Sequence, residues 1–194
     1  MKHLATRLTR ACLSAVLLVG AAPALANAPE ATVALALADK AAVGKARLRV
    51  WGFNVYDATL YTRGGFDAAR YAEQRFALEL AYLRDFEGAD IAERSLKEMQ
   101  DLARIDDATG ARWLAAMKGL FPDVKAGDRI TGVHVPGSGA RFYLNSRLLG
   151  EVADDAFSRL FFGIWLSPRT SQPAMRSTLL QPVAGPSSPV PRTP

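Results

Sequence analysis

The sequence predicts an α+β domain, in which a mostly antiparallel sheet carries a helical layer on one face. Two observations lead to this fold class. Strand-like segments come first, then two segments of helical periodicity, then more strands and a last pair of helices, so the helices are segregated and do not alternate with parallel strands. The turn-rich tetrapeptide Pro136–Gly139 also lies between two short strand-like segments, which indicates antiparallel pairing.

The first 26 residues have the pattern of a secretory signal peptide. Lys2, Arg7 and Arg10 precede an apolar run over residues 11–19, and Ala24–Ala26 supplies small residues for cleavage after Ala26. The apolar run is shorter than the roughly 20 residues of a spanning helix. We therefore expect a periplasmic or secreted protein that has no stable membrane insertion after cleavage.

The rest of the chain is predicted to form one domain over residues 27–180 and a tail. Of the 194 residues, removal of the first 26 leaves 168, a length that fits a single domain with a sizeable core. From residue 181 onward, five prolines in fourteen residues, together with serine and glycine, predict a disordered tail over residues 181–194.

Charge and composition exclude several classes of function. Loss of the signal peptide removes three basic and no acidic residues, so the formal charge falls from +5 to +2 and support for a nucleic-acid partner disappears. The only cysteine, Cys12, lies in the signal peptide, and His134 is the only histidine outside it. We therefore expect no disulfide, thiol nucleophile, zinc site or other cofactor. The oligomeric state is not fixed by the sequence.

The first half of the domain is predicted to consist of strands. Thr32–Ala38 is apolar and strand-compatible, a turn region follows over residues 39–44, and Gly44–Thr62 has the β-branched and aromatic content of extended chain. Residues 75–83 alternate between apolar and polar side chains, which predicts a half-buried strand. Its apolar face consists of Phe76, Leu78, Leu80 and Tyr82.

Two helices and a meander of strands are predicted next. Apolar side chains recur at helical spacing over Ala89–Ala103 and over Asp107–Phe121, where Pro122 ends the second helix. Three strands then follow, joined by tight turns. The predicted strands are Asp128–Val135, Ala140–Leu144 and Leu148–Val152.

The last part of the domain is predicted to be helical. Asp154 is a good N-cap for a helix over Asp155–Leu166, whose apolar side chains occupy nearly every side, so this helix should be buried or cover an apolar surface. A short helix is expected over Ser171–Leu180.

Three polar features have ordinary structural explanations. His134 is expected to be a partly exposed strand residue, since no Gly-x-Ser-x-Gly motif supports a catalytic triad. The Gly137–Gly139 segment lies between two strands and lacks the helix N-terminus of a phosphate loop, so it predicts a hairpin turn. Asp154 and Asp155 could be read as paired carboxylates, but their position favours helix capping.

Arg47, Arg49 and Tyr56 form the strongest candidate site. Arginine is a planar, permanently charged donor suited to carboxylates, and a tyrosine hydroxyl adds a neutral donor. Strict alternation places the two arginines on one face and Tyr56 on the other, unless a bulge at Gly52 brings them together. From the residues alone, the candidates are therefore an anion clamp, or surface arginines with a core tyrosine.

Several short segments form a recognisable series, spread in consistent order over about residues 35–180. They are Gly44-x-Ala46–Arg49, Gly52–Ala58, Leu60–Tyr61, Ile91–Ser95, Phe121–Val124, Ala126–Arg129, Pro136-Gly137-x-Gly139–Tyr143 and Phe161–Leu166. Together these segments resemble the bacterial chalcone isomerase-like family.

The resemblance implies an open-faced β-sandwich, with an antiparallel sheet, helices on one side and an apolar cleft between the layers. The superfamily includes plant chalcone isomerases and non-catalytic relatives that hold a fatty-acid carboxylate with an arginine and a tyrosine. Tyr56 occupies the place of that tyrosine, where the isomerases have threonine. The isomerases' further tyrosine, asparagine and late-helix polar residue fall near Glu87, Arg94 and Leu160, so their catalytic set is not matched.

The sequence therefore favours an exported protein that binds a small amphiphilic, carboxylate-bearing ligand without a cofactor. Arg47 or Arg49 is expected to pair with the carboxylate and Tyr56 to donate a hydrogen bond, while Phe53, Leu80 and Phe161 line the apolar part. Two alternatives remain. One is an isomerase or lyase that uses Tyr56 as a proton donor, and the other is an interaction role for the helix over residues 157–166.

Overall fold

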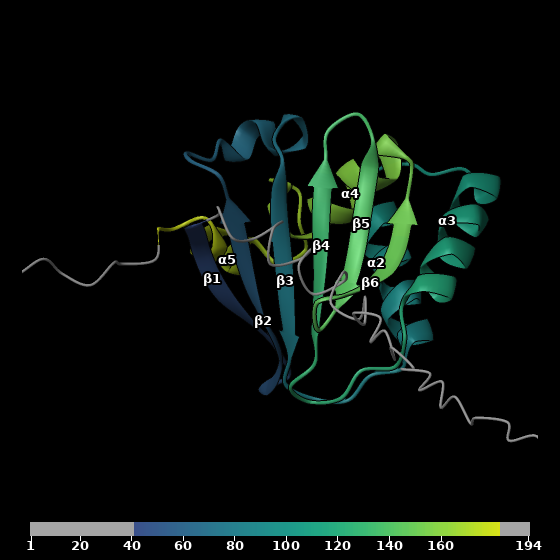
Figure 1. Ribbon diagram of the computed structural model, residues 1–194, viewed down its shortest axis with the longest axis horizontal. Helices are drawn as coiled ribbons and strands as arrows, with labels where there is room; N and C mark the ends of the chain where they lie inside the picture. Colours follow the sequence, from purple (N-terminus) through teal and green to yellow (C-terminus); the bar gives the residue numbers. More distant parts are fainter. Residues whose placement is uncertain (1–40, 183–194) are drawn as a thin grey trace, which may run out of the picture.

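The computed structural model describes residues 41–182, which form a six-stranded antiparallel sheet with helices on one face (Figure 1). The strand order follows the chain, from β1 at one edge to β6 at the other. The α+β class and the antiparallel sheet expected from the sequence are confirmed. The predicted signal peptide (1–26), the strand predicted over Thr32–Ala38 and nearly all of the predicted tail (181–194) lie outside the described residues.

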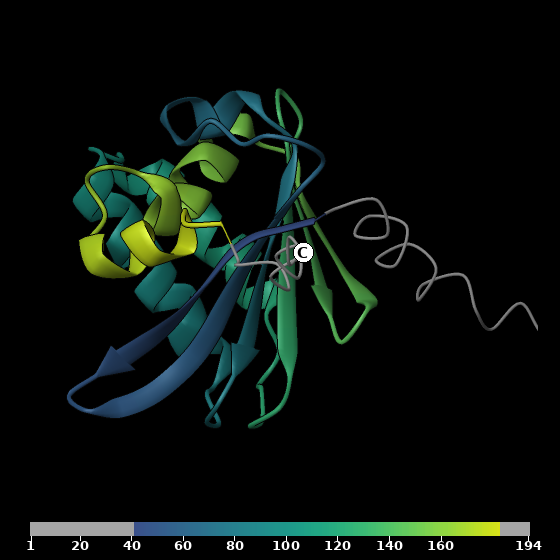
Figure 2. The ribbon, with the colours of Figure 1, turned by 90° about the vertical axis from the view of Figure 1, so that its left-hand side faces the viewer.

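The helices form a layer on one side of the sheet, as Figure 2 shows. Helix α4 packs on β4 and β5, α5 packs on β1, and α2 packs against α4. The strands are β1 (Ala41–Val50), β2 (Phe53–Thr62), β3 (Phe76–Tyr82), β4 (Arg129–Val135), β5 (Gly139–Leu144) and β6 (Arg147–Val152). The helices are the 3-10 helix η1 (Ala68–Glu73), α2 (Gly88–Leu102), α3 (Asp107–Leu120), α4 (Asp155–Leu166) and α5 (Pro173–Leu179).

The segment predicted as one extended stretch over Gly44–Thr62 is a hairpin. Val50 pairs with Phe53, and Trp51 and Gly52 between them have φ of +49° and +85°. Positive φ at both central residues is the geometry of a type I′ turn, which usually selects asparagine, aspartate or glycine. The single-strand prediction was wrong because tryptophan at the first turn position hides the turn. Strand β1 also begins at Ala41, inside the turn region predicted over residues 39–44.

The core lies between the sheet and α4, and it is rich in aromatic rings. The predicted apolar face of β3 is confirmed, since Phe76, Leu78, Leu80 and Tyr82 are all buried in it. Ring centroids of Phe76 and Phe162 are 5.0 Å apart, and those of Phe142 and Phe161 are 5.1 Å apart, both edge to face. Helix α4 is buried as its apolar pattern predicted, and Asp154 caps it by accepting from the Phe157 N–H at 3.0 Å.

His134 is fully buried, which corrects the expectation of a partly exposed residue. Its Nδ1 lies 2.6 Å from the Ser158 hydroxyl and its Nε2 lies 2.9 Å from the Ala72 carbonyl oxygen. Burial lowers the pKa of His134, because the charged imidazolium is poorly solvated there. The ring therefore holds η1 and α4 to the sheet as a neutral group.

Folding stability should consequently fall as the pH falls below the ordinary histidine pKa of about 6.5. The unfolded chain binds a proton at His134 more readily in that range than the folded chain does. We expect lower stability at pH 5.5 than at pH 7.5, measured by urea unfolding. In His134→Gln this slope should flatten although the variant is less stable overall. An unchanged slope in that variant would contradict the assignment.

Candidate functional site

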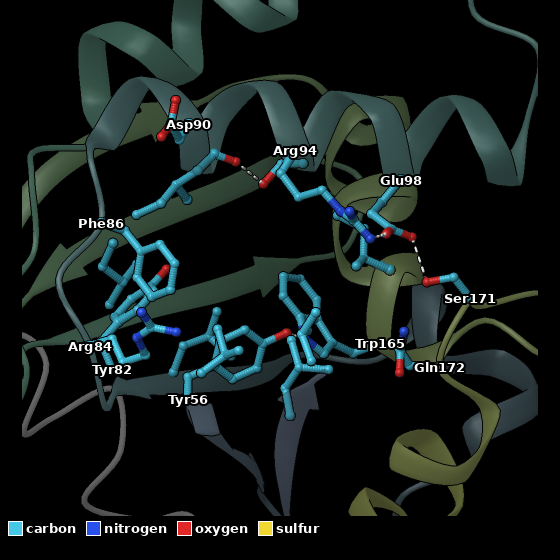
Figure 3. Close-up of a pocket in the computed structure, with 18 of the residues that line it drawn as sticks. Tyr56, Tyr82, Arg84, Phe86, Asp90, Arg94, Glu98, Trp165, Ser171 and Gln172 are labelled. Atoms are coloured by element: carbon cyan, nitrogen blue, oxygen red, sulfur yellow. Dashed lines mark hydrogen bonds and ion pairs between the residues drawn. The ribbon is translucent and has the colours of Figure 1, made fainter. Parts of the chain in front are cut away.

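A pocket of about 530 Å³ lies between the sheet and helices α2 and α4 (Figure 3). Its volume is in the range of pockets that hold small organic ligands, roughly 300–1,000 Å³. Most of its wall is apolar, with Leu48, Leu80 and Ile130 on the sheet side and Ile91, Phe161 and Ile164 on the helix side. The aromatic helix α4 therefore does not fill the space between the layers.

The pairing of β1 with β2 decides which side chains face the pocket. Leu48 pairs with Tyr56 and Arg49 pairs with Asn54, so Val55 is an extra residue in β2. Such a bulge turns neighbouring side chains of one strand toward the same face. Leu48, Val55 and Tyr56 all line the pocket as a result. The bulge lies at Val55 and not at Gly52, where the sequence suggested it.

Neither predicted arginine lies at the pocket. Arg47 forms two hydrogen bonds with Asp57, from Nε to Oδ1 at 2.6 Å and from Nη2 to Oδ2 at 2.8 Å. The same contact raises the pKa of Arg47 and lowers that of Asp57. Arg49 donates from Nε to the Asn54 side chain at 2.9 Å. The expected convergence of Tyr56 with Arg47 or Arg49 does not occur, because the bulge leaves both arginines out of the pocket lining.

The other four predicted site residues line the pocket together. Tyr56, Phe53, Leu80 and Phe161 all belong to its wall, although they come from β2, β3 and α4. The Tyr56 ring also lies edge-on to Tyr82, with centroids 6.0 Å apart.

Tyr56 is held as a neutral phenol. Its oxygen accepts a hydrogen bond from the Trp165 indole N–H at 2.9 Å. Burial raises the pKa of Tyr56 to about 12, and burial also raises the pKa of Tyr82. At neutral pH the Tyr56 hydroxyl therefore keeps its proton and can donate it in a hydrogen bond to a ligand.

A positive charge at the pocket comes from Arg94 on α2, which pairs with Glu98, and not from the arginines of β1 that were expected from the sequence. Arg94 and Glu98 pair across one helical turn, and Glu98 also accepts from the Ser171 hydroxyl at 2.7 Å. Glu98 is buried, whereas the Arg94 side chain is largely exposed. Figure 3 shows both on α2, across the pocket from Tyr56, and their charges act in opposite directions on the Tyr56 pKa. The pocket thus has one polar end with Tyr56, Arg94 and Glu98.

Arg94 was not predicted as a site residue from the sequence, where it stands only as a departure from the isomerase pattern. A usable signal was present on the same helix: Ile91, Ser95 and Glu98 follow one another at i, i+4 and i+7, so they share a face. A glutamate on a core-facing stripe requires a partner, and an arginine four residues before it is in position to provide one.

The far end of the pocket opens near the β1–β2 turn. Val50, Trp51 and Phe53 line it there, and the Arg84 guanidinium carbon lies 5.0 Å from the centre of the Phe53 ring. In the part of the chain that the structure describes, no three acidic, histidine or cysteine side chains gather as a metal site would require. Residues 41–182 also contain no helix that combines the length and apolarity needed to cross a membrane.

An open antiparallel sheet, one helical layer and an apolar pocket between them define the class of protein. The chain belongs to the chalcone isomerase-like family, whose family model matches residues 41–181. The resemblance noted in the sequence is thereby confirmed.

Two known proteins are similar to this chain, one in sequence and one in fold. An uncharacterized protein of Haemophilus influenzae is 30% identical over 131 residues, a match that covers 67% of this chain and 63% of that protein's length. The crystal structure of a fatty-acid binding protein of Arabidopsis thaliana matches with a TM-score of 0.58 at 11% identity, over 73% of this chain and 87% of that one. At that identity, the second match establishes a shared fold.

Proposed function

We propose that this protein binds a small amphiphilic molecule with a carboxylate head group, such as a fatty acid, in the pocket between the sheet and α2. The observation that carries the proposal is the pocket itself, whose wall is mostly apolar but carries Tyr56, Arg94 and Glu98 on its lining, with Arg84 and Asp90 at the opposite end. An apolar wall with a few polar groups matches the two parts of an amphiphilic acid. The fatty-acid binding function named for the Arabidopsis protein of the same fold supports the same ligand class.

The head group is assigned to Arg94 and Tyr56. A guanidinium has five N–H donors, and the hydrogen bond to Glu98 uses one of them. The remaining donors and the neutral Tyr56 hydroxyl can serve a carboxylate, and the tail would lie along Phe53, Leu80 and Phe161. This arrangement keeps the arginine–tyrosine clamp expected from the sequence but takes its arginine from α2.

The isomerase alternative receives less support from the pocket. In that alternative Tyr56 takes part in proton transfer, yet burial raises its pKa to about 12, against the opposing effect of the Trp165 hydrogen bond. A group so far from neutral pH is poorly matched to acid–base catalysis. We therefore propose binding as the function of this pocket.

We also propose that the protein is exported to the periplasm, on the basis of the signal-peptide pattern in residues 1–26. Native mass spectrometry of protein purified from the periplasm tests this point and the ligand class together. We expect the mass of a chain that begins after Ala26, with an acid among the bound molecules. A protein found only in the cytoplasm with its first 26 residues intact would overturn the proposal of export.

Binding is tested by adding decanoate, with decanol as the matched neutral control. At a concentration about 100-fold above Kd, decanoate should raise Tm by about 5 °C or more, and decanol should raise it less. Tyr56→Phe should weaken decanoate binding about tenfold, because a hydrogen bond to a charged group is lost. Equal stabilisation by acid and alcohol would exclude a carboxylate-specific site.

A further inference from the structure

Exposed apolar side chains gather at the end of the β1–β2 hairpin. Among residues 41–182, five large apolar side chains are exposed, and three of them, Val50, Trp51 and Phe53, form the tip of this hairpin. A fourth, Leu83, lies beside it, since its N–H donates to the Val55 carbonyl at 2.9 Å. Figure 2 shows the hairpin (dark blue) curving away from the ends of the other strands toward the helical side. We call residues 50–53 the hairpin tip.

Trp51 is not explained by packing or by turn geometry. The residue is 95% exposed, so it adds nothing to the core. Its φ of +49° lies in the left-handed region, which costs an L-residue other than glycine, asparagine or aspartate about 1 kcal/mol. A strained backbone that presents a large aromatic ring to solvent suggests a function for that ring.

The surroundings of the tip are basic. Arg49 precedes it and is exposed, and Arg84 lies over the Phe53 ring. The nearby Asp85 is paired with Lys125, whose Nζ donates to its carboxylate at 2.9 Å. Tryptophan and phenylalanine at a protruding tip, flanked by arginine, match the composition of segments that sit at the interface of anionic membranes.

We propose that the hairpin tip docks on the surface of a lipid bilayer that contains anionic lipids. A stable protein–protein interface needs roughly 20–30 residues on each side, far more than this narrow tip offers. Shallow insertion among lipid head groups requires only a few apolar and aromatic side chains with basic neighbours. Because Val50, Trp51 and Phe53 also line the pocket, docking would place the pocket entrance at the lipid surface. Loading of an amphiphile from the membrane through this entrance rests on the proposed function.

Vesicle flotation and tryptophan fluorescence test the docking surface without any pocket ligand. The vesicles are phosphatidylcholine with or without phosphatidylglycerol. Trp113 and Trp165 are buried, so a blue shift of emission on vesicle addition reports on Trp51. We expect Trp51→Ser to abolish the shift and weaken vesicle binding roughly tenfold, as loss of a large buried apolar side chain would. Leu148→Ser is the matched control, because Leu148 is exposed on β6 away from the tip, and it should bind as the wild type does.

The positive charge beside the hairpin tip allows a second test of docking. Arg49→Gln should weaken binding to phosphatidylglycerol vesicles about fivefold and change binding to pure phosphatidylcholine little. Equal effects of Trp51→Ser and Leu148→Ser, or no vesicle binding by the wild type, would overturn the proposal. The proposal would also be overturned if the protein dimerises without lipid and Trp51→Ser abolishes the dimer, because the hairpin tip would then bind a second copy of this chain. Vesicle binding by Arg94→Gln should persist even if its decanoate binding is lost, which separates this proposal from the proposed function.

Discussion

Replacing Arg94 with glutamine should weaken decanoate binding by roughly 10- to 100-fold and leave decanol binding nearly unchanged. The estimate follows from the loss of charge-assisted hydrogen bonds, about 1.5–3 kcal/mol. Only the acid carries the charge that Arg94 recognises, so the alcohol is an internal control. Isothermal titration calorimetry measures both affinities directly. Tm alone is unsuitable here because the variant also leaves the buried Glu98 without its ion pair.

Two further variants test the direction in which charge changes decanoate affinity and the position of the anion site. Glu98→Gln should strengthen decanoate binding several-fold, because it removes a negative charge beside the proposed head-group position. Arg47→Gln should have no effect on affinity, since Arg47 pairs with Asp57 and does not line the pocket. If Arg47→Gln weakens binding and Arg94→Gln does not, the anion site belongs to β1 as the sequence first suggested.

Gly88→Ala should cause a large loss of folding stability, because Gly88 begins α2, the helix that carries part of the pocket wall. A Cβ at Gly88 would lie 2.0 Å from the Phe121 carbonyl oxygen and 2.8 Å from the Pro122 carbonyl carbon. Both are backbone atoms, so the start of α2 must move. We expect a loss of about 3 kcal/mol, or roughly 10 °C in Tm, measured by thermal unfolding.

The effect should reach the pocket, because α2 carries Arg94 and Glu98 and its first N–H is tied to Asp123 at 2.9 Å. Gly119→Ala is the matched control: Gly119 is also helical, and a Cβ there meets nothing within 4 Å. That change should stabilise the protein by about 0.5 kcal/mol, through better helix propensity. Similar effects of the two substitutions would show that the close approach at Gly88 is tolerated by small backbone shifts.

The parts of the fold set by local periodicity could be predicted from the sequence. The strict alternation in β3 identified its buried face, and the all-round apolar pattern of α4 identified it as a core helix. Asp154 was recognisable as an N-cap, because capping depends on a local preference. Tyr56, Leu80 and Phe161 line the pocket for the same reason: apolar and aromatic side chains on inward faces converge once the sheet meets its helical layer. Phe53 also lines the pocket, but from the exposed tip of the hairpin.

The charged part of the site could not be predicted in this way. The orientation of Arg47 depends on a bulge at Val55, which sequence alternation does not reveal. The hairpin turn was hidden because Trp51 stands where asparagine or glycine is usual. Arg94 belongs to α2, and only the packing of that helix over the sheet brings it opposite Tyr56. Each of these features depends on pairing or on tertiary packing.

A crystal structure of the protein with bound decanoate would locate the head-group site. We expect the acid to occupy the pocket, with its carboxylate within hydrogen-bonding distance of the Arg94 guanidinium and the Tyr56 hydroxyl. Its chain should lie along Leu80 and Phe161 toward the hairpin tip. A carboxylate at the opposite end beside Arg84, or an acid bound outside the pocket near Arg47, would overturn the assignment of the head group to Arg94 and Tyr56.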